Sequence, residues 1–426
     1  MSRPTGSRRT RDIPVPRPTA RGWALLGVGV GLVAAGLIVT MGVVITAGLL
    51  LVFLDVAGVV VALSVAAPLR ADRRISRAVV EVGDIHRERI ELVGLRARLA
   101  PTVSVHVHES MSPQLTGLAE AAATVTIGPN RPPARLEFEA LAVQRGIASV
   151  GPLRVRVVDP FGLVRVDRSA LRPTEVVVVP RGANVGTIDT GALAGAVSAD
   201  QGRVGQGGSA DDSELRPYRP GDPIRRVHWA QSARRGELHV RQTTQAQPPE
   251  AVVALDLRPS VYQDLGRDDL SELADIDGLV AFEHAVVVAA GVARQLAARA
   301  SHVTLVADDA AAGPERPRGG SGLQEALVEL ATVQPHTASS PPETMLAAAA
   351  ARGLSGMTAV ITGHCSEHEA LALVGQGQRG ARGLFVSIVP PSGVVRGIFE
   401  RAGWRVITVP VPAGAHGHRG HRRSAS

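Results

Sequence analysis

The chain has 426 residues, enough for two or three domains, and hydrophobic residues make up 45% of it while aromatic residues make up only 3%. The formal net charge is +7, and all 46 basic residues are arginines because the sequence contains no lysine. A Walker-type phosphate loop and lysine-based covalent catalysis are therefore excluded. The single cysteine, Cys365, excludes a disulfide framework and a cysteine-rich zinc site.

Two long apolar runs lie near the N-terminus, at residues 23–40 and 43–67. Each is long enough to cross a bilayer core of about 30 Å as a helix. Arginines flank the pair on both sides and the turn between the runs has none, so the positive-inside rule places both flanks in the cytoplasm. We expect a disordered basic arm over 1–22 and a transmembrane hairpin over 23–67 in the inner (plasma) membrane. Both termini and the soluble domains would then be cytoplasmic.

Asp55 lies near the middle of the second apolar run. An ionisable residue inside a bilayer is a functional candidate by default. We favour a hydrogen bond between helices, either within the hairpin or in an oligomer. The alternatives are a tolerated polar residue in a tilted helix and, less favoured, a proton or ion pathway.

Residues 76–182 contain short stretches rich in β-branched residues, broken by Gly, Pro and Asn. Several short strands at this spacing predict an all-β sandwich. The stretch VDPFGL, residues 158–163, has the signature of a turn, and we expect Phe161 to lie in the core beside it. Residues 183–213 are rich in Gly, Ala and Ser and read as a linker.

From about residue 250 onward, apolar strands alternate with helical stretches. This pattern predicts a parallel sheet with helices on both faces, that is, a doubly wound α/β domain. Its first strand, AVVALDL, ends near Asp256, and ligands of such sheets bind beyond the carboxyl ends of the strands. We expect this domain and the element before it to cover 214–412, followed by a disordered tail over 413–426.

The stretch LRPYRPGDPIRRVHWAQSARRGELHVRQ, residues 215–242, contains seven arginines. Asp222 can cap a helix, Pro223 suits its first position and Gly236 can end it, so the sequence predicts a helix over 223–235 and then a strand. This places the arginines on a helix and a strand that directly precede the α/β sheet.

The stretch TGHCSEHEA surrounds the single cysteine. Ser366 and Glu369 have the spacing of a capping box, so we interpret Cys365 as a residue at the start of a helix. A Cys–His nucleophile using His364, or metal binding by His364 and His368, has no other support in the sequence.

The pattern Tyr-x-x-Gly-Asp-x-x-Arg-x-x-x-Trp, followed by VVALDLRPS, resembles the signature of the bacterial domain-of-unknown-function family numbered 58. Residues 145–166 and the N-terminal hairpin also resemble that family, so the resemblance covers nearly the whole chain. The signature residues are Tyr218, Gly221, Asp222, Arg225, Arg226, Trp229 and Arg234. The resemblance implies a fold like that of the von Willebrand factor A domain and a MoxR-type AAA+ ATPase as partner.

The von Willebrand A fold often carries a metal site built on Asp-x-Ser-x-Ser after its first strand. This chain offers Asp256 and Ser260, but Arg258 stands where the first serine would be. An arginine would repel a divalent cation and can pair with the aspartate. We therefore expect a degenerate site with an Asp256–Arg258 ion pair and no cofactor, with Mg²⁺ as the less favoured alternative.

These features together predict a non-enzymatic, membrane-anchored scaffold or interaction protein. It would work with an AAA+ ATPase in protein complex assembly or an envelope-related process. One alternative is nucleic-acid or phosphate binding through the arginine-rich stretch, but stacking aromatics are scarce and no reader motif is present, so we expect no nucleic-acid partner. The other is a hydrolase of unknown class using Asp256. Sequence spacing assigns no catalytic residue and leaves the oligomeric state open.

Overall fold

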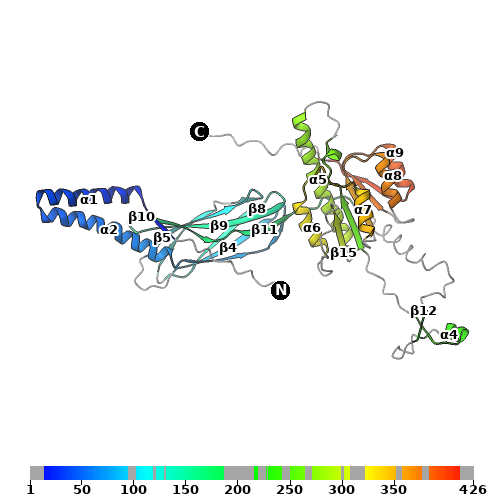
Figure 1. Ribbon diagram of the computed structural model, residues 1–426, viewed down its shortest axis with the longest axis horizontal. Helices are drawn as coiled ribbons and strands as arrows, with labels where there is room; N and C mark the ends of the chain where they lie inside the picture. The colour runs from blue at the N-terminus through cyan, green and yellow to red at the C-terminus, as the bar shows by residue number, and fades with distance from the viewer. Residues whose placement is uncertain are drawn as a thin grey trace. The chain divides into compact units, whose positions relative to one another are not determined.

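The computed structural model has two compact units, Met1–Val179 and Pro180–Ser426 (Figure 1). The described residues are 14–94, 102–118, 121–128, 131–186, 215–218, 227, 229–241, 250–263, 271–298, 302–307, 322–351, 357–376 and 383–412.

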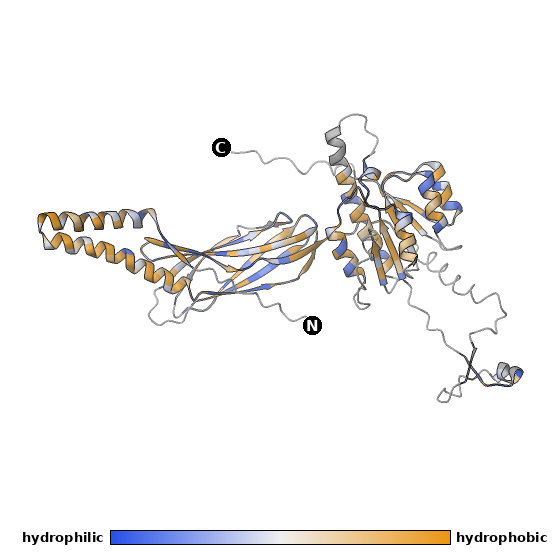
Figure 2. Cartoon of the chain, viewed as in Figure 1, coloured by the Kyte–Doolittle hydropathy of each residue, from blue (hydrophilic) through white to orange (hydrophobic). Residues whose placement is uncertain are grey.

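Two apolar helices, α1 (Ala20–Val39) and α2 (Gly42–Ala66), form a hairpin in the first unit. Their mean hydropathies of 2.2 and 2.7 and their lengths are sufficient to cross a membrane, and Figure 2 shows hydrophobic residues along both. The helices approach closely because glycines face each other. A Cβ atom on Gly48 would lie 2.6 Å from the carbonyl oxygen of Gly29, so a larger residue does not fit there.

The last turns of α2 pack against the strands that follow it. Ala62, Val65 and Ala66 are buried in one core with residues from the strands that follow. Asp55 lies beside Gly22, since a Cβ atom there would be 3.4 Å from Asp55 Oδ1. Asp55 is thus level with the first turn of α1, at the sandwich end of the hairpin.

Two sheets form the β-sandwich of the first unit and share the core that receives α2. The larger sheet has the order β1-β10-β9-β11-β3, with β5 paired to β9 and β7 paired to β5; the smaller has the order β2-β4-β8-β6. The strands are β1 (Val15–Pro18), β2 (Arg70–Ile75), β3 (Val79–Glu81), β4 (Ile85–Val93), β5 (Val103–Met111), β6 (Leu115–Gly117), β7 (Ala122–Ile127), β8 (Ala134–Ala142), β9 (Gly146–Val158), β10 (Val164–Leu171) and β11 (Thr174–Val179).

Two expectations for this unit need correction, and one sheet has a feature that the sequence did not predict. Residues 15–18 of the expected disordered arm form an edge strand, where the missing N–H groups of Pro16 and Pro18 are tolerated. The larger sheet is mixed, because β11 pairs with β3 in parallel. Phe161 is 60% exposed and does not lie in the core.

The second unit contains a parallel five-stranded sheet with the order β15-β14-β16-β17-β18. Its strands are β14 (Glu250–Leu255), β15 (His302–Val306), β16 (Met357–Thr362), β17 (Gly383–Ser387) and β18 (Arg405–Thr408). The helices are the short 3₁₀ helix η2 (Pro259–Tyr262), α5 (Ser271–Ala297), α6 (Gly322–Thr332), α7 (Pro342–Ala351), α8 (Glu367–Gln376) and α9 (Gly393–Arg401). Helix α5 packs on β14 to β16 and beside α6, whereas α7, α8 and α9 pack against one another in sequence.

Helix α5 is also apolar enough to cross a membrane, but 61% of its most apolar window is buried inside the protein. Two chain segments cross it. The Ala183 N–H donates to the Val287 carbonyl at 2.9 Å, and the ring of His284 hydrogen-bonds to the Val409 carbonyl at 3.2 Å. The all-round hydrophobicity of α5 is therefore explained by protein contacts.

A small element carries the described part of the arginine-rich stretch. Strand β12 (Leu215–Pro217) pairs antiparallel with β13 (His239–Arg241), and α4 (Trp229–Arg235) lies between them in sequence. Gly236 follows α4 with φ +76°, as predicted for the helix end. The predicted helix over 223–235 is not continuous, because Val227 forms a β-bridge and α4 begins at Trp229; residues 223–226 lie outside the described residues.

Candidate functional site at the carboxyl edge of the parallel sheet

The sheet order places a topological switch point between β14 and β16. The chain leaves β14 for β15 on one side and later returns to β16 on the other. Ligands of open α/β sheets bind at such a point, beyond the carboxyl ends of the strands. Asp256 directly follows β14 and Thr362 ends β16, so both lie at the switch point.

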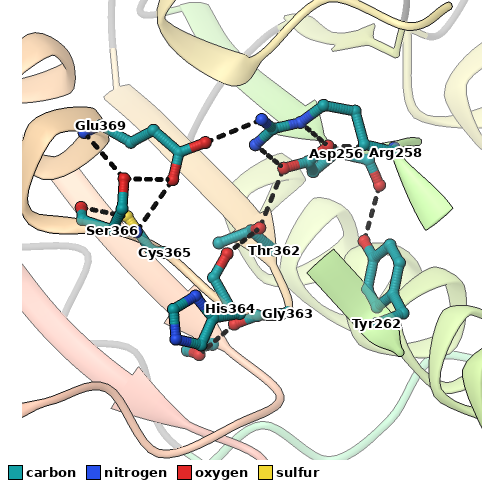
Figure 3. Close-up of polar contacts among 10 residues, drawn as sticks. Asp256, Arg258, Tyr262, Thr362, Gly363, His364, Cys365, Ser366 and Glu369 are labelled. Atoms are coloured by element: carbon teal, nitrogen blue, oxygen red, sulfur yellow. Dashed lines mark hydrogen bonds and ion pairs between the residues drawn. The ribbon is translucent and has the colours of Figure 1, made fainter. Parts of the chain in front are cut away.

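Asp256 is fully buried and its carboxylate is held by two neighbours (Figure 3). Arg258 binds it with two side-chain nitrogens, Nε to Oδ1 at 3.0 Å and Nη2 to Oδ2 at 2.8 Å. The Thr362 hydroxyl donates to Oδ2 at 3.0 Å. The structure thus contains the ion pair that the Asp-x-Arg spacing suggested, in the planar two-point geometry that arginine favours.

The same guanidinium reaches a third element. Arg258 Nη1 donates to Glu369 Oε1 at 2.7 Å, across 111 residues of sequence. Glu369 belongs to the capping box of α8, where its Oε2 accepts from the Ser366 backbone and hydroxyl, each at 2.8 Å. Burial opposes ionisation of this carboxyl, but the bonds from Ser366 and Arg258 hold the pKa of Glu369 below its ordinary value. Both carboxylates together raise the pKa of Arg258, so it stays charged.

Backbone groups complete the support of the site. The buried Tyr262 hydroxyl donates to the Asp256 carbonyl at 2.6 Å. The His364 N–H donates to the Val261 carbonyl at 2.7 Å, so the loops after β14 and β16 touch directly. This contact requires glycine at position 363, because a Cβ atom there would lie 2.0 Å from the Val261 oxygen.

A groove of about 200 Å³ lies beside this network, lined by residues 363–367 and 389–392 with Val395. Helices α8 and α9 both begin at it, the second capped by the Ser392 hydroxyl, which accepts from the Val395 N–H at 3.2 Å. Cys365 also lines the groove, but burial raises the pKa of its thiol to about 12. The thiol therefore stays protonated near neutral pH and is a poor nucleophile.

The arrangement does not fit a divalent cation as it stands. Both Asp256 oxygens are engaged by Arg258, and Ser260 is exposed on η2. Within the described ranges, no three His, Cys, Asp or Glu side chains come together in a way that could hold a metal ion. The positive charge beside Asp256 is supplied by the chain itself.

The other predicted residues lie elsewhere. In the signature, Tyr218 is half-buried and its N–H donates to the Leu238 carbonyl at 2.7 Å, Trp229 is 62% exposed and Arg234 is exposed. Gly221, Asp222, Arg225 and Arg226 fall outside the described residues. Asp55 is buried in the hairpin, and neither of its carboxylate oxygens finds a hydrogen-bond partner in the described part of the chain.

The sequence did not reveal Thr362, Tyr262 and Glu369 as partners of the Asp256–Arg258 pair. For Glu369, the sequence did contain one indication, the spacing of its capping box with Ser366. The capping box places it at the start of the helix that follows β16, the strand next to β14, but this neighbour relation depends on the strand order.

Comparison with known families gives a match to the second unit. Residues 214–363 match the family described as "Protein of unknown function DUF58". This part, about a third of the chain, is similar to the DUF58 family. The match includes the signature element, Asp256, Arg258 and Thr362, whereas Glu369 lies just beyond it.

No curated protein matches the chain. Among solved structures, the CARDB domain of a Pyrococcus furiosus protein, in complex with di-metal ions, is similar at 19% identity, covering 26% of this chain and 87% of that one with a TM-score of 0.18. The complex of zinc 2-glycoprotein and prolactin-inducible protein from human seminal plasma gives 12% identity, 26% and 93% coverage and a TM-score of 0.20. Likenesses at this level carry no information about activity.

Proposed function

We propose that this protein is a membrane-anchored, non-enzymatic scaffold whose DUF58-containing α/β domain binds a protein partner at the carboxyl edge of its parallel sheet. The domain is cytoplasmic and similar to the von Willebrand factor A domain. Its partner is an AAA+ ATPase, in line with the family resemblance.

The β1–β10 pairing supports the anchoring. Residues 15–18 precede α1, and β10 follows α2, yet the two strands pair along four residues from Val15 to Pro18. Chain segments that share a sheet lie on the same side of a bilayer, which supports an even number of spans between them. The arginines on both flanks favour the cytoplasmic side.

One observation supports a role in binding rather than catalysis. Asp256, Arg258, Thr362 and Glu369 form hydrogen bonds and ion pairs with one another. A catalytic acid or base needs a proton-exchanging group that can reach a substrate. Here the two carboxylates, the guanidinium and the hydroxyl bind one another and fix the loops that border the groove. A rigid rim around a shallow concavity suits recognition of a protein surface.

Isolation of the full chain from native membranes in mild detergent, followed by mass spectrometry, tests the proposal. We expect an AAA+ ATPase to be enriched with the wild type and with Arg396→Met, which alters a half-buried arginine of α9 outside the network. We expect the enrichment to fall with Arg258→Met. Equal recovery from all three, or no ATPase in any, would contradict the proposal.

A further inference from the structure

The turn between β9 and β10 contacts both helices of the hairpin, through hydrogen bonds to the start of α1 and through close packing against α2. Thr19, the N-cap of α1, donates from its hydroxyl to the Gly162 carbonyl and from its backbone to the Leu163 carbonyl, each at 2.8 Å. On the other helix, Gly58 faces Asp159, because a Cβ atom added to this glycine would lie 3.4 Å from Asp159 Oδ2. The turn therefore lies level with the start of α1.

Large apolar side chains are exposed around this junction. Phe161, at the tip of the turn, is 60% exposed, Trp23 in the first turn of α1 is 62% exposed and Val60 of α2 is 61% exposed. The turn itself is ordered by Asp159, whose Oδ2 accepts from the Phe161 N–H at 3.0 Å and whose Oδ1 accepts from the Val164 N–H at 2.6 Å. The Phe161 ring is thus held outside the core by a defined backbone.

The length of α1 fixes the level of the turn relative to a bilayer. Its 20 residues extend about 30 Å, which matches the thickness of the hydrocarbon core. If α1 spans that core, its ends lie at the two surfaces, and Thr19 with the attached turn lies at the surface facing the sandwich. Trp and Tyr are enriched at this level because their amphipathic rings lie among the headgroups, and Phe side chains of surface-bound helices are buried at the same boundary.

We propose that the β9–β10 turn is a lipid-contacting loop, in which Phe161 enters the headgroup region beside Trp23 of the same leaflet. This inference rests on the proposed membrane anchoring. The occupant is the bilayer because contacts at Thr19 and Gly58 hold the turn against the hairpin, so that the exposed Phe161 adds to the exposed apolar surface that Trp23 begins on α1. The β-sandwich is then in direct contact with the membrane surface, since α2 continues without a break into the core of the sandwich.

Spin labels at single cysteines test this in the full chain reconstituted in liposomes, on a Cys365→Ala background. The labels are placed by Phe161→Cys, Val30→Cys and Ile147→Cys, three positions that are 54–60% exposed in this structure. Ile147 is a matched control, because it lies at the opposite end of β9, about 35 Å along the strand from the turn. Collision with oxygen and with a water-soluble nickel complex reports the depth of each label.

We expect the label at 161 to favour oxygen over nickel at headgroup depth, the label at 30 to be deep in the bilayer and the label at 147 to be aqueous. A deep label at 30 with an aqueous label at 161 would overturn the lipid contact alone. An aqueous label at 30 would overturn the anchoring on which it rests.

Discussion

A single guanidinium, that of Arg258, joins the loop after β14 to α8, although Glu369 of α8 lies 111 residues further along the sequence. It binds Asp256 after β14 and Glu369 in α8, while Thr362 of β16 donates to the same aspartate. The side chain of Arg258 is 20% exposed and that of Asp256 is fully buried. Removing the arginine would leave a buried carboxylate without its counter-charge, which is the costly way to break such a pair.

We predict that Arg258→Met destabilises the second unit by about 3 kcal/mol, the lower end of the range for breaking a buried ion pair, because its partial exposure weakens the effect. Trp404, buried beside Phe399, provides the fluorescence signal for urea unfolding of the purified full chain. Arg396→Met serves as the control and should change stability little. Equal midpoints for the two variants would contradict the structural role of the network.

A second buried charge cluster lies inside the sandwich. Arg73 of β2 pairs with Glu88 of β4 and, at 2.7 Å, with Glu109 of β5, all with side chains at most 2% exposed. Burial, with the nearby Glu88 charge, raises the pKa of Glu109 to about 8 despite Arg73. Burial also lowers the pKa of His86, and Arg73 adds to that effect.

The raised pKa of Glu109 gives a pH-dependent stability of known sign. The folded protein holds this proton more tightly than the unfolded chain, in which the carboxyl titrates near 4.5. Stability from this group is therefore greatest below that pH and is lost as the pH rises toward 8. We predict that Glu109→Gln, which keeps an acceptor for Arg73, gains melting temperature relative to the wild type as the pH goes from 5 to 9.

Melting curves of the full chain at several pH values measure this difference. His86 acts in the opposite direction, since its lowered pKa costs stability as the pH falls through its ordinary value near 6.5. That effect is present in both proteins and cancels in the comparison. A difference that stays constant from pH 5 to 9 would show that Glu109 does not hold the extra proton.

Residue-level prediction from sequence succeeded where partners are neighbours in the chain. Asp256 and Arg258 are two residues apart, so their pairing could be foreseen from chemistry alone. Glu369 of α8 finds its partner in the loop after β14, and Glu109 finds its partner in the opposite sheet of the sandwich, so sequence spacing gives no information about either pair. Phe161 was placed in the core because its type is usually buried, while its surroundings depend on how the hairpin meets the sandwich.

At the level of single elements, the α8 capping box connects local structure to the site. Ser366 accepts from the Glu369 N–H at 3.3 Å and donates to the carboxylate that binds Arg258. Ser392 caps α9 in the same way but has no link to the ion-pair network. The two serines therefore form a natural comparison.

We predict that Ser392→Ala costs about 1 kcal/mol, the usual loss of an N-cap, and that Ser366→Ala costs more because it also frees Glu369. Urea unfolding followed by Trp404 fluorescence measures both. A smaller loss of unfolding free energy for Ser366→Ala than for Ser392→Ala would contradict the idea that the capping box of α8 supports the Asp256–Arg258 network.

The packing of α1 against α2 depends on close approach at specific glycines. A Cβ atom on Gly48 would lie 2.8 Å from the Val33 backbone nitrogen, whereas one on Gly31 meets nothing within 4 Å. We predict that Gly48→Val lowers the thermal stability of the detergent-purified chain and that Gly31→Val does not. Similar melting temperatures for the two variants would mean that the helices are not packed in this way.

The elements that sequence patterns missed depend on distant partners. Residues 15–18 look like an arginine- and proline-rich arm, and their strand exists because β10, about 150 residues later, offers an edge. The predicted helix over 223–235 has suitable caps, but Val227 forms a β-bridge and α4 begins at Trp229. Local propensity is overruled in both cases by pairing.

At the scale of the molecule, the first unit combines a hairpin of two helices that are apolar and long enough to cross a membrane with a β-sandwich, and the two share one core. The outer face of the smaller sheet carries cross-strand ion pairs, such as Arg87 with Glu139 and Arg89 with Glu137, which is typical of a surface in water. Composition and charge predicted an apolar hairpin beside soluble domains. The passage of α2 into the sandwich core could not be predicted, because its apolar residues look alike in lipid and in protein.

The second unit presents the switch-point network and the groove on one edge of its sheet. We propose that a protein partner binds at this edge. A photo-crosslinking amino acid at His364, which is exposed beside the groove, tests it in native membranes. Glu400, exposed near the end of α9 and hence toward the opposite edge, is the control position.

We predict a discrete protein adduct, identified by mass spectrometry as an AAA+ ATPase, from position 364 and not from position 400. No adduct from position 364, or the same adducts from both positions, would contradict partner binding at the carboxyl edge.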